Sequence, residues 1–199
     1  MMKQAKPYYD VKNSTKRICV LQGGTRSGKT YSILLALIEF AYKNKDKGIY
    51  ITIARKTFPA LRGTAMRDFF EILKRENLYD ERFHNKSNSI YYLFGNNVEF
   101  ISVDQPVRVR GRKRSVLFLN ECNEFGFEEY TQLALRTTYK IIIDFNPSEQ
   151  YHWLYSQIID ADRDDVDFHI STYKDNPFLE ESTIKEIERL KEVDANLYR

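Results

Sequence analysis

Eight residues near the amino terminus, from Gly23 to Thr30, have the spacing G-x-x-x-x-G-K-[ST]. This spacing has a physical meaning only where a strand enters the motif and a helix leaves it. Residues 17–21 are a short apolar run of strand formers, and apolar residues recur at helical spacing from 31 to 43. A glycine-rich turn that opens a helix leaves unpaired N–H groups, and the helix dipole adds partial positive charge. The sequence therefore predicts a phosphate-binding loop made of Gly23, Gly24, Thr25, Arg26, Ser27, Gly28, Lys29 and Thr30.

Two residues of this loop have defined tasks when a nucleoside triphosphate binds. Lys29 is expected to reach the β- and γ-phosphate oxygens, and the hydroxyl of Thr30 is expected to coordinate Mg²⁺. Tyr8 or Tyr9, just upstream, is a candidate for stacking on the base.

Strand and helix signals alternate regularly along the rest of the chain, which predicts an α/β fold with a central, mostly parallel sheet covered by helices. Besides the strand at 17–21, strands are expected at 49–53, 116–119, 139–145 and 166–172, and helices at 31–43, 58–76, 127–136, 151–159 and 181–193. A β-hairpin insertion is expected near 89–103, with its turn at residues 95–97. No repeat, low-complexity tract or linker interrupts the pattern, so residues 1–199 are expected to form one domain.

A second set of candidate catalytic residues follows the strand at 116–119. Four apolar residues and then the pair Asn120-Glu121 have the form of a Walker B strand. Glu121 is expected to orient and polarise the attacking water. Asn120 stands where Asp is usual; its carbonyl oxygen can still accept a hydrogen bond from a metal-bound water, but one negative charge is lost. The alternative is that the pair only begins the next loop.

Asn146 ends the strand expected to lie between the P-loop strand and the Walker B strand in this class of ATPase. There its amide is placed to sense the γ-phosphate, although an Asn-Pro turn after a strand has the same appearance. Because ligands bind at the carboxyl ends of parallel strands, residues 23–30, Asn120, Glu121 and Asn146 should gather at one edge of the sheet.

Arginines form the third group of candidates. Arg26, inside the loop, either contacts the γ-phosphate of the same subunit or forms an ion pair that shapes the site. Residues 108–114 are strongly basic, and the run contains Arg108, Arg110, Arg112, Lys113 and Arg114. Three interpretations remain open for this run: a solvated surface, a contact with a nucleic-acid backbone, or an arginine finger inserted into a neighbouring subunit.

Composition narrows the class of protein. A net charge of +3 is too small to indicate nucleic-acid binding by itself. Cys19 and Cys122 are interpreted as reduced packing residues of a cytosolic protein, because neither has a partner at metal-ligand spacing. No apolar stretch approaches the roughly 18–20 residues of a membrane span, and the amino terminus lacks a secretion signal.

Taken together, the motifs resemble the ATPase domain of the large terminase subunit, the DNA-packaging motor of tailed bacteriophages. The resemblance runs through nearly the whole chain and rests on residues 22–30, 54–62, 110–112, 119–121, 144–147 and 171–179. The last segment, STYKDNPFL, has no general P-loop explanation and is the most discriminating. The resemblance implies a P-loop NTPase of the ASCE type that hydrolyses ATP with Mg²⁺.

Site residues are carried over from the resemblance by position. Arg26 matches the arginine of the terminase Walker A loop, Glu121 the catalytic glutamate, Asn120 a family variant of the Walker B acid, and Asn146 the coupling motif. Arg110 lies where a finger acting in trans is expected, with Arg108 and Arg112 as rivals; Arg108, Arg112, Lys113 and Arg114 are candidates for DNA contact.

The resemblance also implies partners and surroundings. It implies double-stranded DNA, a portal protein and a small terminase subunit as partners in the host cytoplasm, without a membrane. A pentameric ring is expected during packaging, whereas the isolated domain can be a monomer.

One departure from the family concerns the carboxy terminus. Large terminases normally continue into a nuclease domain, and this chain ends at Arg199, about where the linker to that domain would begin. We therefore expect a motor domain without nuclease activity, from a fragment or a split gene. Two other classes stay open: another P-loop motor or helicase, or a nucleotide-binding module with little ATPase activity.

Overall fold

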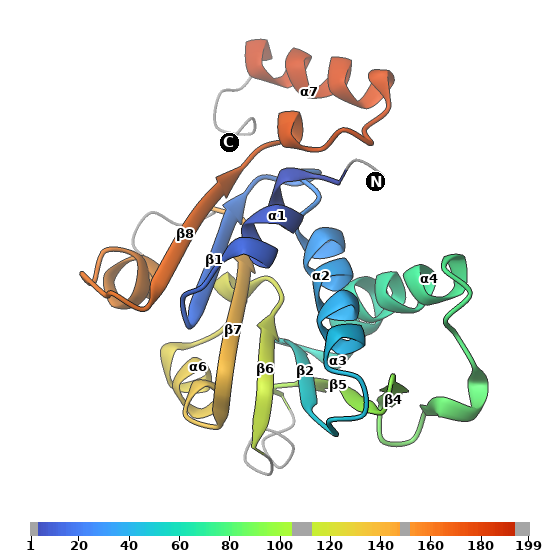
Figure 1. Cartoon of the computed structure of the whole chain (residues 1–199). Coiled ribbons are helices and arrows are strands. Elements are labelled where there is room, and N and C mark those ends of the chain that lie inside the picture. Colours follow the sequence, from blue (N-terminus) through green and yellow to red (C-terminus); the bar gives the residue numbers. More distant parts are fainter. Residues whose placement is uncertain (1–3, 105–112, 148–151, 194–199) are drawn as a thin grey trace.

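The computed structural model describes residues 4–104, 113–147 and 152–193. Within these residues, the centre of the molecule is an eight-stranded sheet in the order β3-β4-β5-β2-β6-β7-β1-β8 (Figure 1). The strands are β1 Ile18–Gly23, β2 Tyr50–Arg55, β3 His84–Asn85, β4 Ile90–Leu93, β5 Asn96–Ser102, β6 Arg114–Leu119, β7 Thr137–Phe145 and β8 Val166–Ser171. The α-helices are α1 Lys6–Asn13, α2 Lys29–Lys43, α3 Phe58–Leu61, α4 Arg67–Arg75, α6 Phe127–Ala134 and α7 Glu181–Val193.

Strand β7 lies between the P-loop strand β1 and the strand β6 that precedes Asn120. The pairs β5–β2, β2–β6, β6–β7, β7–β1 and β1–β8 are parallel, whereas β3, β4 and β5 are joined antiparallel. The prediction of a mostly parallel sheet, with one strand between the P-loop strand and the Walker B strand, is therefore confirmed. The carboxyl ends of β1, β6 and β7 lie at one edge, where such sheets bind ligands.

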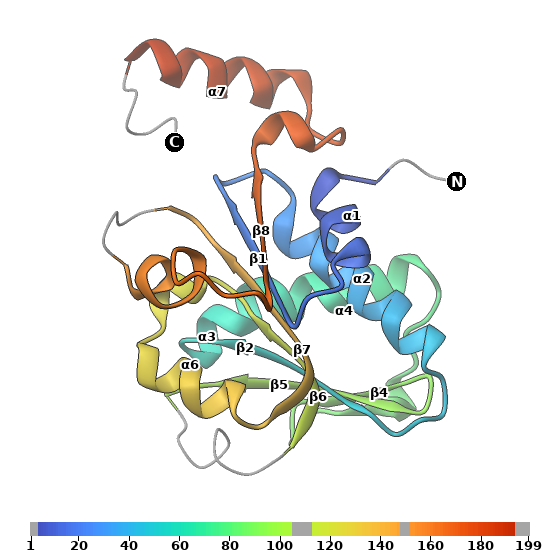
Figure 2. The same ribbon diagram turned by 60° about the vertical axis from the view of Figure 1, so that its left-hand side comes forward.

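Both faces of the sheet are covered, which explains why its central strands are almost continuously apolar. Along β1, Cys19 and Leu21 pack on the side of α2, α3 and α4, while Ile18 and Val20 pack on the side of α6. Figure 2 shows these helices on opposite sides of the sheet. A π-helical turn at Tyr155–Ile159 completes the second side.

The expected helix at 58–76 is divided into three parts. α3 leads into a π-helical segment, Arg62–Met66, which continues as α4. The apolar pattern did not reveal the π-helical turn, because its apolar positions are buried in all three parts, as at Leu61, Ala65 and Phe69. Similarly, the helix expected at 151–159 is a π-helical turn in its described part, and α1 was not predicted at all.

The hairpin differs in its turn and in its position. The turn consists of Phe94 and Gly95, which both have positive φ, as a two-residue type I′ turn requires. Asn96, expected in the turn, is instead the first residue of β5 and is fully buried. The hairpin also extends the central sheet, because β5 pairs with β2.

Candidate nucleotide-binding site

The predicted phosphate loop connects β1 directly to α2. β1 ends at Gly23, and α2 begins at Lys29 after Gly28, whose φ is 79°. Arg26 also has a left-handed backbone, with φ of 72°. Non-glycine residues in this region are uncommon and tend to occur at functional sites. The backbone has the strand–turn–helix form that the motif requires.

Lys29 is buried, and its ammonium group is held inside the loop. Nζ donates to the backbone oxygen of Gly23 at 2.6 Å and to the side-chain oxygen of Asn146 at 3.0 Å. It also lies 3.3 Å from the oxygen of Gly24 and from Oγ of Ser27. Burial lowers the pKa of Lys29, while the charges of Asp144 and Glu121 act in the opposite direction. Asn146 is thus brought to the P-loop, as expected.

Asp144 joins the P-loop to the end of β6. Its carboxylate accepts hydrogen bonds from Thr30 Oγ1 at 2.7 Å, from the backbone N–H of Glu121 at 2.8 Å and from Asn120 Nδ2 at 3.1 Å. Asp144 is 0% exposed and Asn120 is 1% exposed. Sequence reasoning placed Thr30 and Asn120 here but missed Asp144, whose only signal is an acid inside the apolar run of β7.

The oxygen atoms gathered here suit Mg²⁺. Magnesium prefers oxygen ligands, and Thr30, Asn120 and Asp144 supply a hydroxyl, an amide oxygen and a carboxylate. The amide oxygen of Asn120 is buried and accepts no hydrogen bond from the residues that the structure describes. These residues fit a bound Mg²⁺, with one carboxylate among them.

Glu121 stands at the end of β6 with a left-handed backbone, φ 52°. Burial, followed by the nearby charge of Asp144, raises the pKa of Glu121 to about 7, although Lys29 and Arg55 act against the shift. A carboxyl group with a pKa near the working pH can accept a proton from water and release it again. Glu121 therefore stays a candidate for activating water.

The STYKDNPFL segment contacts the P-loop. Asn176 Nδ2 donates to the backbone oxygen of Arg26 at 2.9 Å, and a side chain added at Gly28 would meet the Asn176 amide. The side chain of Arg26 itself is exposed and forms no ion pair with any residue that the structure describes. An ion pair that shapes the site therefore has no support in the described part of the chain.

Arg108, Arg110 and Arg112 lie outside the described residues. Lys113 is exposed and stays a candidate for DNA contact. The prediction for Arg114 was wrong: its side chain is 2% exposed at the first position of β6, so it is not available to a DNA backbone. Charge density suggested a solvated residue, but the charge of Glu99 lies close enough to act favourably on the buried guanidinium.

Two cavities lie beside α2. An open cavity of about 1000 Å³ adjoins the loop and is lined by Gly28, Tyr8, Tyr31 and Asn176, among others. Tyr9 is absent from this lining and is 40% exposed, so Tyr8 is the better candidate for contact with a base.

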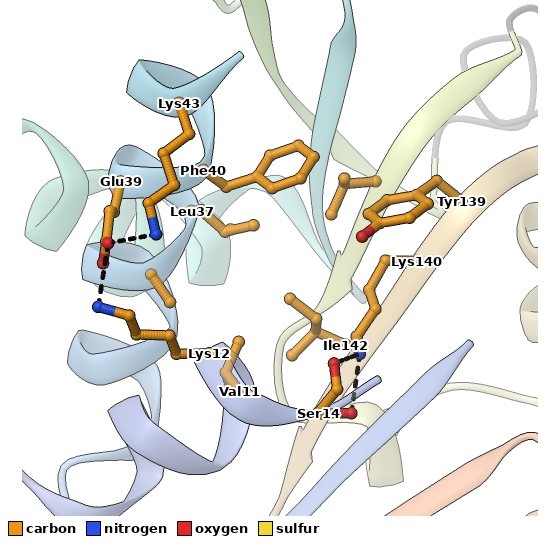
Figure 3. Close-up of a pocket in the computed structure, with 12 residues that line it drawn as sticks. Val11, Lys12, Ser14, Leu37, Glu39, Phe40, Lys43, Tyr139, Lys140 and Ile142 are labelled. Atoms are coloured by element: carbon orange, nitrogen blue, oxygen red, sulfur yellow. Dashed lines mark hydrogen bonds and ion pairs between the residues drawn. The ribbon is translucent and has the colours of Figure 1, made fainter. Parts of the chain in front are cut away.

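A smaller cavity of about 130 Å³ lies between α1, α2 and β7 and contains none of the P-loop residues in its lining (Figure 3). Lys140 Nζ donates there to the backbone oxygen of Ser14 at 2.7 Å and to its hydroxyl at 2.8 Å. Glu39 pairs with Lys12 at 3.0 Å and with Lys43 at 2.7 Å. The contacts of Lys140 with Ser14 and of Glu39 with Lys12 join α1 and the residue that follows it to the body of the molecule.

Comparison with known proteins identifies the family. A sequence model described as phage terminase large subunit matches residues 15–199. The chain belongs to this family. The PBSX phage terminase large subunit of Bacillus subtilis (strain 168) is 25% identical over 236 residues, which include 100% of this chain and 52% of the relative. The chain thus spans about half the length of this curated relative.

Solved terminases share the fold. The large terminase of a thermophilic bacteriophage matches with a TM-score of 0.79 and 18% identity, over 96% of this chain and 50% of that one. The Thermus phage P74-26 large terminase ATPase domain matches with a TM-score of 0.71 and 14% identity, over 98% of this chain and 91% of that one. The first of these two proteins has also been solved in complex with ADP and with ATP-γ-S. The predicted fold and the predicted terminase family are confirmed.

Among the described residues, no helix of the terminase chain combines the length and the apolar character that crossing a membrane requires.

Proposed function

We propose that this chain hydrolyses ATP in the presence of Mg²⁺. The observation that carries the proposal is the convergence of Lys29, Thr30, Glu121 and Asn146 at the carboxyl edge of the sheet, around the buried acid Asp144. A phosphate-binding loop alone indicates nucleotide binding; a water-polarising acid beside it indicates hydrolysis.

The residues of this chain have separate roles in the proposed reaction. The loop amides and Lys29 hold the phosphates, Glu121 takes the proton of the attacking water, and Arg26 is exposed where it can reach the γ-phosphate. Thr30 would hold Mg²⁺, Asn120 would accept a hydrogen bond from a metal-bound water, and the ion would neutralise charge on the phosphate oxygens. The large terminase of the thermophilic bacteriophage binds ADP and ATP-γ-S. By extension, the base of ATP here occupies the open cavity beside Tyr8.

We further propose that residues 1–199 form the ATPase domain of a motor that moves double-stranded DNA into a procapsid in the host cytoplasm. Membership of the terminase family supports this role. The proposal includes a portal protein and a small terminase subunit as partners and a pentameric ring as the packaging assembly. Arg108, Arg112 and Lys113 are proposed to contact DNA.

ATP turnover at increasing protein concentration tests the hydrolysis proposal. Glu121→Gln keeps the size of the side chain but removes the base, so turnover should fall by at least about 100-fold, as removal of a general base typically does. Glu128→Gln, an equivalent change at an exposed residue of α6, is the matched control and should leave turnover unchanged. Equal turnover in Glu121→Gln and the unsubstituted chain would refute the assignment.

A mixing experiment tests whether Arg110 acts in trans. Arg110→Ala has an intact nucleotide site but no finger, and Glu121→Gln has an intact finger but no base. Each variant alone should therefore be inactive. Their mixture should recover turnover in a concentration-dependent way, because fingers of this kind contribute roughly 10³–10⁵-fold in rate. Lys113→Ala is the control for loss of charge. Turnover by Arg110→Ala alone argues for Arg108 or Arg112, or against a finger in this run, and a mixture that stays inactive argues that Arg110 does not act in trans.

Asn120 favours the alternative function, a nucleotide-binding module with little ATPase activity. In that case ATP should bind tightly, and turnover should be absent even at high concentration and with DNA present.

A further inference from the structure

We propose that Asp144 supplies the negative charge of the Mg²⁺ site in place of the acid missing at Asn120. The inference rests on the proposed Mg²⁺-nucleotide function. It assigns the charge to strand β7, whereas the position expected from the motif is on β6.

The register of the sheet places Asp144 at the level of both motifs. Asp144 pairs with Leu21, two residues before the P-loop begins at Gly23. On the other side Leu119 pairs with Ile143, so Asn120 stands at the level of Asp144. A side chain on β7 therefore reaches both the loop and the end of β6.

Among the residues that the structure describes, the charge of Asp144 has no cation in direct contact, and Lys29 acts on it only from beyond ion-pair distance. The carboxylate accepts hydrogen bonds from a hydroxyl, a backbone N–H and an amide, at 2.7, 2.8 and 3.1 Å. All three donors are neutral, and no ion pair joins Asp144 to a residue in the described part of the chain. Burying a carboxylate in this way is unfavourable, and a bound cation would offset the penalty.

The side-chain amide of Asn120 is a suitable hydrogen-bond donor for the carboxylate of Asp144. Its Nδ2 lies 3.1 and 3.3 Å from the two oxygens of Asp144, a distance that suits an amide donor. An Asp at position 120 would place a second carboxylate there, and like charges so close strongly disfavour joint ionisation. The buried Oδ1 of Asn120, which accepts no hydrogen bond from the described residues, remains as a neutral acceptor for a metal-bound water. The site thus contains one carboxylate, that of Asp144, and it comes from β7, the strand beside β6.

Asp144 also orients the predicted metal ligand. Thr30 Oγ1 gives its proton to Asp144 and accepts a hydrogen bond from Asn120 Nδ2 at 3.3 Å, so one lone pair of the hydroxyl oxygen stays available to an ion. Asp144 is therefore a positioning residue that acts through Thr30 and through its charge.

Titration with a fluorescent ATP analogue, in Mg²⁺ and in EDTA, tests the proposal. The unsubstituted chain should bind more tightly in Mg²⁺. Asp144→Asn keeps the size of the side chain and one of its two acceptor oxygens but removes the charge. It should reduce affinity in Mg²⁺ by about 10- to 100-fold, a typical effect of the groups that support metal ligands. Affinity in EDTA should change by less than threefold.

The double variant Asn120→Asp/Asp144→Asn moves the charge to β6 and should restore the Mg²⁺ advantage. Asn120→Asp alone places two carboxylates together, so Mg²⁺ should raise its melting temperature by more than that of the unsubstituted chain. This variant also provides the decisive measurement if Asp144→Asn does not fold.

The outcomes separate the two proposals. No binding of the analogue by the unsubstituted chain contradicts the proposed function. Binding with a Mg²⁺ advantage that persists in Asp144→Asn overturns the role of Asp144 alone. An equal response of Asn120→Asp and the unsubstituted chain to Mg²⁺ also overturns it.

Discussion

Gly23 joins the P-loop to the sheet at a point where no side chain fits. A Cβ built at Gly23 would lie 2.3 Å from the backbone oxygen of Ser171 and 2.7 Å from its Oγ. Ser171 is the residue of β8 that pairs with Gly23, so the obstacle is a neighbouring strand. Gly23→Ala therefore forces β1 and β8 apart at the start of the loop.

The loss of stability expected for Gly23→Ala follows from these distances. Ordinary contact with a Cβ begins at 3.4 Å, so the backbone of β8 must move by about 1 Å where the parallel ladder holds it. Overpacking of this kind costs about 1–3 kcal/mol, and a backbone obstacle belongs at the upper end, so we expect a loss of about 3 kcal/mol.

Gly63 offers the same chemical change without the obstacle. It lies in the π-helical segment, and a Cβ there would meet nothing within 4 Å. Gly63→Ala should raise the free energy of unfolding by up to about 1 kcal/mol, because alanine is the better helix former and restricts the unfolded chain. The two Gly→Ala variants should thus differ by about 4 kcal/mol.

Urea unfolding measured by the fluorescence of Trp153, the single tryptophan, gives both values. Nucleotide binding by the folded fraction provides a second readout, since only Gly23→Ala should weaken it. A free energy of unfolding for Gly23→Ala within about 1 kcal/mol of the unsubstituted chain would show that β8 yields freely, and the reasoning would be refuted.

Three further predictions concern stability and reactivity. Asn96→Ala should lower the free energy of unfolding by about 3 kcal/mol in urea titration, because this buried side chain loses four hydrogen bonds, with Ile49, Ala41, Asn44 and Phe94. The neighbouring change Asn97→Ala should have little effect. Burial raises the pKa of Cys19 to about 11 and that of Cys122 well above its usual value, so a thiol reagent at pH 8 should label neither until the chain unfolds. Hydrogen bonds from Lys43, Tyr8 and Lys12 lower the pKa of Glu39 to about 2, so its carboxylate stabilises the fold above its ordinary pKa of 4.5 and less so as the pH falls towards 2. Because the Glu39 side chain is partly exposed, Glu39→Gln should lose about 1 kcal/mol or less at pH 7, and the difference should shrink in melts at pH 3. Equal losses at 96 and 97, labelling of a folded thiol, or a pH-independent difference would contradict the respective prediction.

The parts of the site that the sequence predicted are those that depend on local spacing and strand order. Lys29 follows from the loop motif, and Glu121 from the strand before it. Asn146 is brought to Lys29 because the carboxyl ends of β1 and β7 lie at the same edge. Parallel pairing converts distant positions in the chain into neighbours, which is why strand alternation was sufficient here.

The parts that escaped prediction depend on tertiary burial. Asp144 lies in an apolar strand and was assigned no role, although a buried acid requires partners. Asn96 has the composition of a turn residue, but its amide completes the hydrogen bonds of the α2 carboxyl end. Arg114 belongs to a basic run and is nevertheless buried. For Asn96 and Arg114 the side-chain type suggested solvent, and in all three cases only the packed structure shows the compensating contacts.

The contacts of Lys29 give Asn146 a physical means of sensing nucleotide. The ammonium group has three protons, and four acceptors surround it: two backbone oxygens and a hydroxyl of the loop itself, and the amide oxygen of Asn146. Phosphate oxygens compete for the same protons, and a charged acceptor forms the stronger hydrogen bond. Of the four, Asn146 alone belongs to a different segment, so its contact is the one through which occupancy of the loop reaches the end of β7. An Asn-Pro turn needs no such contact, whereas a sensor does.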